Sequence, residues 1–379
     1  MIIYYTIFFC LVILAFIERF FYISTKSKKR IILIYSLILV WMSTIYSGKY
    51  GDKEAYELFF KEASSEMLFH PFNGWFEYLY TLLILVSKWI SNSYTFSRFV
   101  LAIVVFSLWY SILTSKRYYF SQKNSFIILL MLWMLDIGNI FIARSTIAMT
   151  ICIFSLRYVE TEELKKFLIV TAIAIGFHTM SVVWIFAYFV YYYSKRYDLK
   201  KWGIIACLLP ILIPSLFRDI LIRIKNISPT LIQRALQHYL NLDRSNMFGM
   251  EFSIRTTMIK GMANMLLLIV VFGYILKRKK QYSLDGNVIS INKFEGYFTI
   301  YILGAILYVI SLGISIALSR AALPFTHVSI FLLPQLFELP ECRKNIGFRF
   351  LIFGVLVLYI FLRFTLNLRG NNIGAFIIE

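Results

Sequence analysis

Charged residues are scarce in this sequence. They make up 16% of its 379 residues, whereas hydrophobic residues make up 60% and the mean hydropathy is +0.73. This balance excludes a soluble globular domain. Segments of about ten residues with alternating polarity are absent, which excludes a transmembrane β-barrel. Apolar runs long enough to cross a bilayer recur along the chain. Composition therefore predicts an all-α polytopic membrane protein.

The sequence also lacks the motifs of several enzyme and transporter classes. There is no GxxxxGKS or GxxxxGKT loop for nucleotide phosphates, no HExxH helix for zinc and no GxSxG elbow. ATP-driven transport and zinc proteolysis are therefore not expected. The cysteines follow no metal-binding or disulfide spacing, and we expect neither a metal nor a cofactor. They are Cys10, Cys152, Cys207 and Cys342.

No internal repeat and no Pro- or Gly-rich linker divides the chain, which predicts a single transmembrane domain over 1–379 with about twelve to fourteen helices. The first run lacks a basic region and a cleavage site, so we interpret it as a retained helix. The run 167–194 is too long for one upright helix and short for two, which predicts a bent hairpin or two short helices. The other predicted spans are 2–23, 31–47, 75–91, 95–114, 125–142, 145–159, 202–217, 258–276, 296–318, 322–338 and 348–366.

The net charge of +19 would suggest nucleic acid in a soluble protein. Here many of the basic residues lie in short loops between apolar runs, where the positive-inside bias explains them and no nucleic-acid partner is needed. This bias places 24–30 in the cytoplasm and the segments 48–74 and 218–256 outside. Three predicted spans separate the basic loops 24–30 and 115–124, where an even number is required, so the N-terminal orientation stays open.

The outer segment 48–74 contains the first candidate residues. Gly51 supports a tight turn, and Asp52 suits the N-cap of a helix that starts near Lys53. Helical spacing then places Asp52, Tyr56 and Phe60 near one face. One interpretation is a capped surface helix on the membrane, and the other is a carboxylate and a phenol at the rim of a sugar-binding cleft.

Two ionisable residues stand out in the stretch 141–184, where two apolar runs are joined by a short charged connector. Such groups are costly at membrane depth and indicate function by default. Arg144 precedes a span in a turn that we expect to face outward. It is either a snorkelling arginine or a phosphate ligand, to which its planar fork is suited. His178, beside Thr179 and Ser181 at an expected helix break, is either a satisfied core histidine or a general base or phosphate partner.

The outer segment 218–256 is strongly basic and includes Arg218, Arg223 and Arg255. Positive charge outside violates the topological bias, so we expect these residues to bind an anion, with a solvated or lipid-headgroup-binding face as the alternative. Farther along, Arg320 opens a predicted span, and Pro324 would free backbone carbonyls at membrane depth.

In order along most of the chain, these motifs resemble the EpsG/Wzy-type bacterial polysaccharide polymerases. The resemblance rests on Gly51-Asp52 with Tyr56, Arg144 with Ala148, Phe177-His178 with Ser181, and Arg320 with Pro324. The chain departs from the family pattern in two places. Ser145 follows Arg144 where the family usually has glutamine, and Lys49 stands where an arginine usually precedes the Gly-Asp pair.

The resemblance implies a polymerase at the periplasmic face of the bacterial inner membrane, with an outward-facing cavity. It would join undecaprenyl-pyrophosphate-linked oligosaccharide units into O-antigen or capsular polysaccharide. Arg144, Arg320, Arg218, Arg223 and Arg255 would bind the donor, with Tyr56 at the sugar cleft. His178 would be the base or a phosphate contact, with Asp52 as the alternative base. Membrane lipid and a chain-length regulator protein are the other expected partners.

Other functions remain open from the sequence. A lipid-linked oligosaccharide flippase or an ion-coupled carrier would show internal repeats and polar residues on both sides of the midplane. We see no repeat, and the candidates cluster at one membrane face. An O-antigen ligase or a related glycosyltransferase would share the pyrophosphate chemistry but use a different acceptor. A membrane O-acetyltransferase is a more distant alternative.

Overall fold

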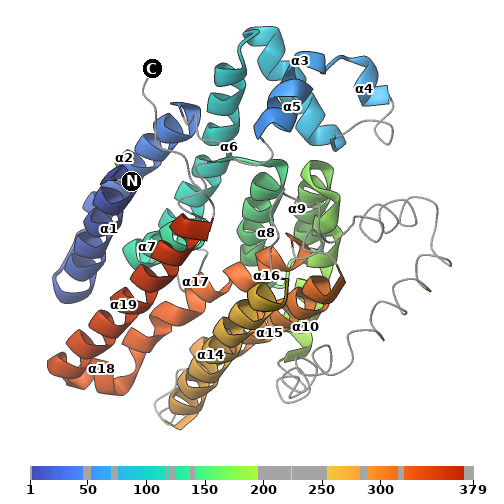
Figure 1. The fold of residues 1–379 in the computed structure, drawn as a ribbon. Helices are drawn as coiled ribbons and strands as arrows, with labels where there is room; N and C mark the ends of the chain where they lie inside the picture. The colour runs from blue at the N-terminus through green and yellow to red at the C-terminus, as the bar shows by residue number, and fades with distance from the viewer. Residues whose placement is uncertain are drawn as a thin grey trace. The chain divides into compact units, whose positions relative to one another are not determined.

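The computed structural model describes residues 2–45, 53–69, 76–115, 118, 124–136, 141–194, 223, 254–281, 288–314 and 320–370 (Figure 1). These residues form helices, and no strand occurs among them. Four helical stretches in this part of the chain are long and apolar enough to cross a membrane: Ile2–Phe20, Tyr94–Thr114, Ser290–Ile310 and Ile346–Leu366. The prediction of an all-α polytopic membrane protein is confirmed. The helix count of twelve to fourteen stays a prediction.

Most helices lie close to the predicted spans, because an apolar segment in lipid must satisfy its backbone hydrogen bonds within itself. In the first half they are α1 (Ile2–Phe20), α2 (Thr25–Ile45), α3 (Lys53–Glu62), α4 (Glu66–Phe69), α5 (Tyr78–Ile90), α6 (Tyr94–Thr114), α7 (Ser125–Asp136) and α8 (Arg144–Glu160). In the second half they are α9 (Leu164–Phe177), α10 (Ile185–Ser194), α14 (Ile254–Gln281), α15 (Val288–Ile314), α16 (Leu323–His327), α17 (Ser329–Leu332), α18 (Pro340–Lys344) and α19 (Ile346–Gly370).

Two predicted spans are interrupted. The run 167–194 divides into α9 and α10, with the 3-10 turn η2 (Thr179–Trp184) between them, as the length of the run indicated. The span 322–338 is not one regular helix. It divides into α16, α17 and the 3-10 turn η5 (Leu333–Glu338), with Pro324 in α16 and Pro334 in η5. Proline lacks an amide hydrogen and clashes with the preceding turn, which interrupts a regular helix. The predicted span 202–217 lies outside the described residues.

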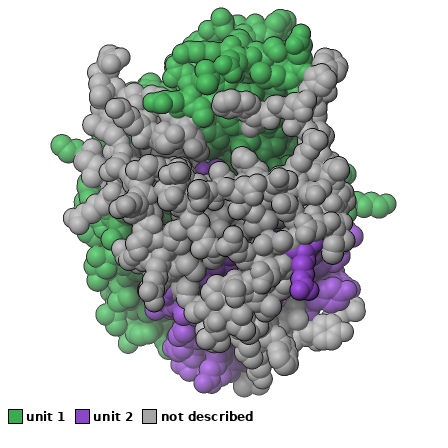
Figure 2. All heavy atoms as spheres, turned by 45° about the vertical axis from the view of Figure 1, so that its right-hand side comes forward, with its two compact units in different colours: residues 1–161, 165–179, 334–379 green, residues 162–164, 180–333 purple. Residues whose placement is uncertain are grey.

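The chain divides into two compact units, which Figure 2 colours separately. The first comprises residues 1–161, 165–179 and 334–379. Within it α7 packs on α1 and on α19, and α6 packs on α2, α5 and α8. Aromatic residues fill the contact between α1, α7 and α19. The rings of Phe8 and Phe364 stack with centroids 5.0 Å apart, and Trp133 Nε1 donates to the carbonyl oxygen of Tyr4 at 3.2 Å.

The second unit comprises residues 162–164 and 180–333, and α15 is its central helix. The helices α10, α14, α16 and α17 all contact α15. Glycines allow two of these close approaches. A Cβ atom at Gly296 would lie 2.3 Å from Cδ2 of Tyr191, and one at Gly304 would lie 2.5 Å from Cβ of Phe325. Both distances are too short for real carbon atoms, so these packing arrangements depend on glycine.

Candidate functional site

The candidate site is centred on Glu77, which immediately precedes α5. Its backbone is extended, and its carboxylate makes no capping hydrogen bond to its own helix. The carboxylate instead binds two other segments of the first unit. Oε2 lies 2.6 Å from Nη1 of Arg144, and Oε1 lies 3.0 Å from Nδ1 of His178. Oε1 also accepts the backbone N–H of Thr179 at 3.1 Å and its hydroxyl at 3.0 Å.

Arg144 is brought to this carboxylate by the start of α8. The residue before it, Ala143, is extended, so the helix begins at Arg144 itself. The backbone N–H of Arg144 faces the hydroxyl of Tyr56 on α3, with a distance of 3.4 Å. Its guanidinium lies over the ring of Phe76, 4.7 Å from the centroid. Tyr56 is buried and packs against Phe76 and Phe141, so α3 covers this side of the site.

His178 is brought to the carboxylate by the end of α9. Its N–H still donates to the carbonyl oxygen of Ala174 at 2.9 Å, as in a regular helix. The chain then changes to the 3-10 turn η2, which directs the N–H of Thr179 to Glu77. A Cβ atom at Gly176 would lie 2.5 Å from Cδ1 of Leu79 on α5. Glycine at this position therefore allows α9 to approach α5 closely enough for the imidazole to reach the carboxylate.

The arrangement joins a carboxylate, a guanidinium and an imidazole in a largely buried place. The side chains of Glu77, Arg144 and His178 are 12%, 22% and 4% exposed. Burial of a carboxylate is unfavourable unless it is hydrogen-bonded and paired, and Glu77 is both. A neutral imidazole that donates from Nδ1 carries its lone pair on Nε2. Chemically, the group combines an imidazole that can accept a proton with a cation that suits an anionic ligand.

A comparison with protein families identifies the chain. The model of the EpsG family matches residues 49–374. The chain belongs to the EpsG family. The matched range includes every motif on which the resemblance to this family was based, so the resemblance is confirmed. Membership supports a polysaccharide polymerase type of function in general. Comparisons with curated proteins and with solved structures gave no match.

Three residues that were predicted for the site of this EpsG-family protein lie in the first unit and are brought together there. Arg144 and His178 share the carboxylate of Glu77, and Tyr56 contacts the backbone of Arg144. Tyr56 thus lies beside the site, in contact with α8. Its expected contact with a sugar stays a prediction.

The remaining predicted residues belong to the second unit or lie outside the described residues and side chains. Arg320 belongs to the second unit, where it is half-buried in a 3-10 turn before α16. Arg223 is exposed. Asp52 and Arg218 lie outside the described residues, and Arg255 is described only by its backbone in α14. Within the described residues, no group of three or more His, Cys, Asp or Glu side chains is arranged to hold a metal ion.

Sequence reasoning missed Glu77, the residue that holds the others. The signal was present, because Glu77 is the only acidic residue in the apolar run 75–91. The argument that selected Arg144 and His178, that ionisable groups in apolar runs are costly and functional by default, applies to it equally. Interpretation of the run only as a span does not select this acidic residue, which lies at the position before α5.

Proposed function

We propose that this EpsG-family protein is a polysaccharide polymerase that uses a lipid-pyrophosphate-linked donor, undecaprenyl pyrophosphate carrying an oligosaccharide repeat unit. The reaction would take place at the periplasmic face of the inner membrane and yield O-antigen or capsular polysaccharide. The family match supports polymerisation in general. The observation that carries the finer proposal is that Arg144 and His178, 34 positions apart in sequence, meet at one carboxylate.

The chemistry of the transfer requires a cation that stabilises the anionic leaving group and a base that takes the proton of the attacking hydroxyl. As the glycan leaves, negative charge develops on the pyrophosphate, and a fixed guanidinium stabilises it. Arg144 supplies such a group. It is already bound to Glu77, but a guanidinium has five N–H donors in a planar fork and can bind a carboxylate and a phosphate through different edges. Arg320 and the basic residues of 218–256 are proposed as further donor contacts.

The attacking hydroxyl of the acceptor sugar must lose its proton. We assign this step to Nε2 of His178, because the hydrogen bond at Nδ1 makes Nε2 the basic nitrogen. A positioned general base of this kind contributes roughly 100- to 10,000-fold to the rate. Asp52 is the alternative base. No step in the proposal requires a metal, since a pyrophosphate is a good leaving group.

The test is complementation of a deletion strain, with glycan chain length measured on gels and membrane abundance measured by immunoblot. Arg144→Ala, His178→Ala and Arg320→Ala should each be present at wild-type abundance and leave cells with single-repeat glycans. Arg343→Ala is the matched control, because Arg343 is 56% exposed and pairs with Glu338 away from Glu77. This control should produce full-length polymer.

Other results would favour the other functions. Long chains from all three variants would refute the assignment of the site. Lipid-linked single units stranded in the cytoplasmic leaflet of the deletion strain would identify a flippase. Full-length lipid-linked polymer that is not transferred to its final acceptor would identify a ligase.

A further inference from the structure

We propose that Glu77 is a positioning residue for the transfer reaction, which holds the imidazole of His178 in its basic orientation and the guanidinium of Arg144 at the same site. This inference rests on the proposed function and adds a residue that neither the motifs nor the resemblance selected. It is carried by geometry, since four donors from two separate segments converge on one carboxylate.

The first argument concerns Oε1 and the imidazole. This oxygen accepts from His178 Nδ1 at 3.0 Å and from both donors of Thr179 at 3.0 and 3.1 Å. The contacts with Thr179 fix the carboxylate relative to the break between α9 and η2, which is also where the imidazole is attached. The ring is therefore oriented by two contacts, one direct and one through the adjacent backbone. Because the proton is held at Nδ1, Nε2 is the nitrogen that takes up the proton of the attacking sugar hydroxyl.

The second argument concerns Oε2 and the charge of the site. Oε2 lies 2.6 Å from Nη1 of Arg144, a short, charge-assisted contact. Before the reaction, the carboxylate balances the guanidinium. When Nε2 takes up a proton, the imidazolium would carry a second positive charge beside Glu77. A carboxylate in contact with the ring stabilises this charged form.

The step balances as follows. The acceptor hydroxyl oxygen forms the new bond to the anomeric carbon of the donor, and its proton moves to Nε2 of His178. The bond from the anomeric carbon to the phosphate oxygen breaks, and the lipid pyrophosphate leaves with the electron pair. The imidazolium then returns the proton to the departing phosphate or to water. Glu77 remains ionised throughout and touches neither sugar nor phosphate, so it acts only through His178 and Arg144.

Substitution of Glu77 by glutamine tests whether the site needs both of these contacts. Both oxygens of Glu77 accept hydrogen bonds, whereas a glutamine amide has one acceptor and one donor group. The NH₂ group must therefore face a donor, either at Arg144 or at His178 and Thr179. Glu77→Gln cannot satisfy both sides. Glu77→Asp keeps two acceptors but is shorter by one methylene group, and it should retain part of the function.

The experiment uses the full chain in lipid nanodiscs, with a lipid-pyrophosphate-linked repeat unit as donor and acceptor. We expect Glu77→Gln to lower kcat about 100-fold or more, the range of a positioned base, and Glu77→Asp to recover at least about a tenth of the wild-type kcat. The control is Glu66→Gln, an exposed acid at the start of α4, which should leave kcat and KM unchanged. ¹⁵N spectra of histidine-labelled protein report which ring nitrogen of His178 carries the proton, with His178→Gln identifying its signals.

The outcomes are distinct. Two results support the proposal. One is a lowered kcat of Glu77→Gln with a changed ¹⁵N pattern for His178, and the other is a lowered kcat with a raised KM for the donor, because Arg144 is no longer held by the carboxylate. If Glu77→Gln only reduces the amount of folded protein while kcat, KM and the ¹⁵N pattern stay at wild-type values, the role is structural and the proposal is wrong. If His178→Ala and Arg144→Ala are also fully active, the proposed function of the site itself fails.

Discussion

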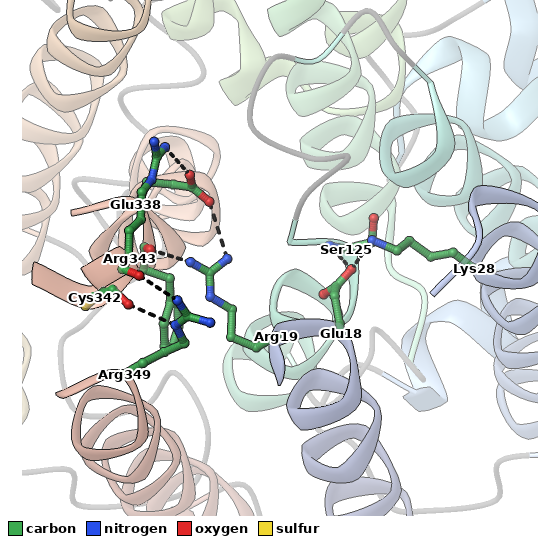
Figure 3. A network of polar contacts seen from close by, with 9 residues as sticks. Glu18, Arg19, Lys28, Ser125, Glu338, Cys342, Arg343 and Arg349 are labelled. Carbon is green, nitrogen blue, oxygen red and sulfur yellow. Dashed lines mark hydrogen bonds and ion pairs between the residues drawn. The ribbon is translucent and has the colours of Figure 1, made fainter. Parts of the chain in front are cut away.

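The buried carboxylate of Glu18 joins three segments of the first unit, and its removal gives a sharp test of the packing. It accepts the backbone N–H groups of Ser125 at 3.1 Å and Phe126 at 2.8 Å, at the start of α7, and pairs with Nζ of Lys28 on α2 at 2.6 Å (Figure 3). The side chain of Glu18 is 2% exposed and that of Lys28 is 16% exposed. Solvent therefore screens this pair much less than a surface pair, which is worth about 0–1 kcal/mol.

The magnitudes follow from what each substitution leaves behind. Glu18→Ala leaves the Lys28 ammonium in a poorly solvated place and two N–H groups without their acceptor. Removal of one partner of a buried pair costs about 3–5 kcal/mol. Lys28→Met should cost less, about 1–3 kcal/mol, because Glu18 keeps both backbone donors. In the double variant both charges of the pair are gone, so its loss of stability should fall short of the sum of the two single losses by about 1–3 kcal/mol.

The measurement is unfolding of the purified protein in detergent micelles for the two single variants and the double variant. Lys29→Met is the control, since Lys29 is an exposed cation next to Lys28 and should change stability by at most about 0.5 kcal/mol. Strictly additive single effects, or a Glu18→Ala variant as stable as Lys29→Met, would refute the reasoning.

Two further predictions concern helix packing. Gly304→Ala would place a Cβ atom 2.5 Å from Cβ of Phe325 and 3.0 Å from its backbone carbonyl carbon, so α16 must move away from α15 and stability should fall by about 1–3 kcal/mol. Gly273→Ala is its control, because nothing lies within 4 Å of that position, and thermal unfolding should show no loss. Lys88→Met removes three hydrogen bonds from Nζ to carbonyl oxygens at the end of α3. Hydrogen exchange should then increase in α3 and stay unchanged in α6. Exchange in α3 at the wild-type rate would contradict a role of Lys88 in holding the end of α3.

Much of the helical architecture could be predicted from the sequence. The helix α6 covers Tyr94–Thr114 where 95–114 was predicted, and the break in 167–194 falls at His178. This success has a simple cause. An apolar segment in lipid can satisfy its N–H and C=O groups only as a helix, so composition and length nearly determine the local structure. The same cost of burying ionisable groups also selected Arg144 and His178 as candidates.

Only the tertiary structure decided which of these residues act together. Glu77 lies 67 positions from Arg144 and 101 positions from His178, and helical periodicity relates only residues three or four positions apart. Their meeting depends on how α5, α8 and α9 pack, including the close approach that Gly176 allows at Leu79. Sequence determined that this chain forms membrane helices with a few costly charges. Packing determined that three ionisable side chains share one site, because contacts between distant segments are set by side-chain shape across helices and not by spacing along one helix.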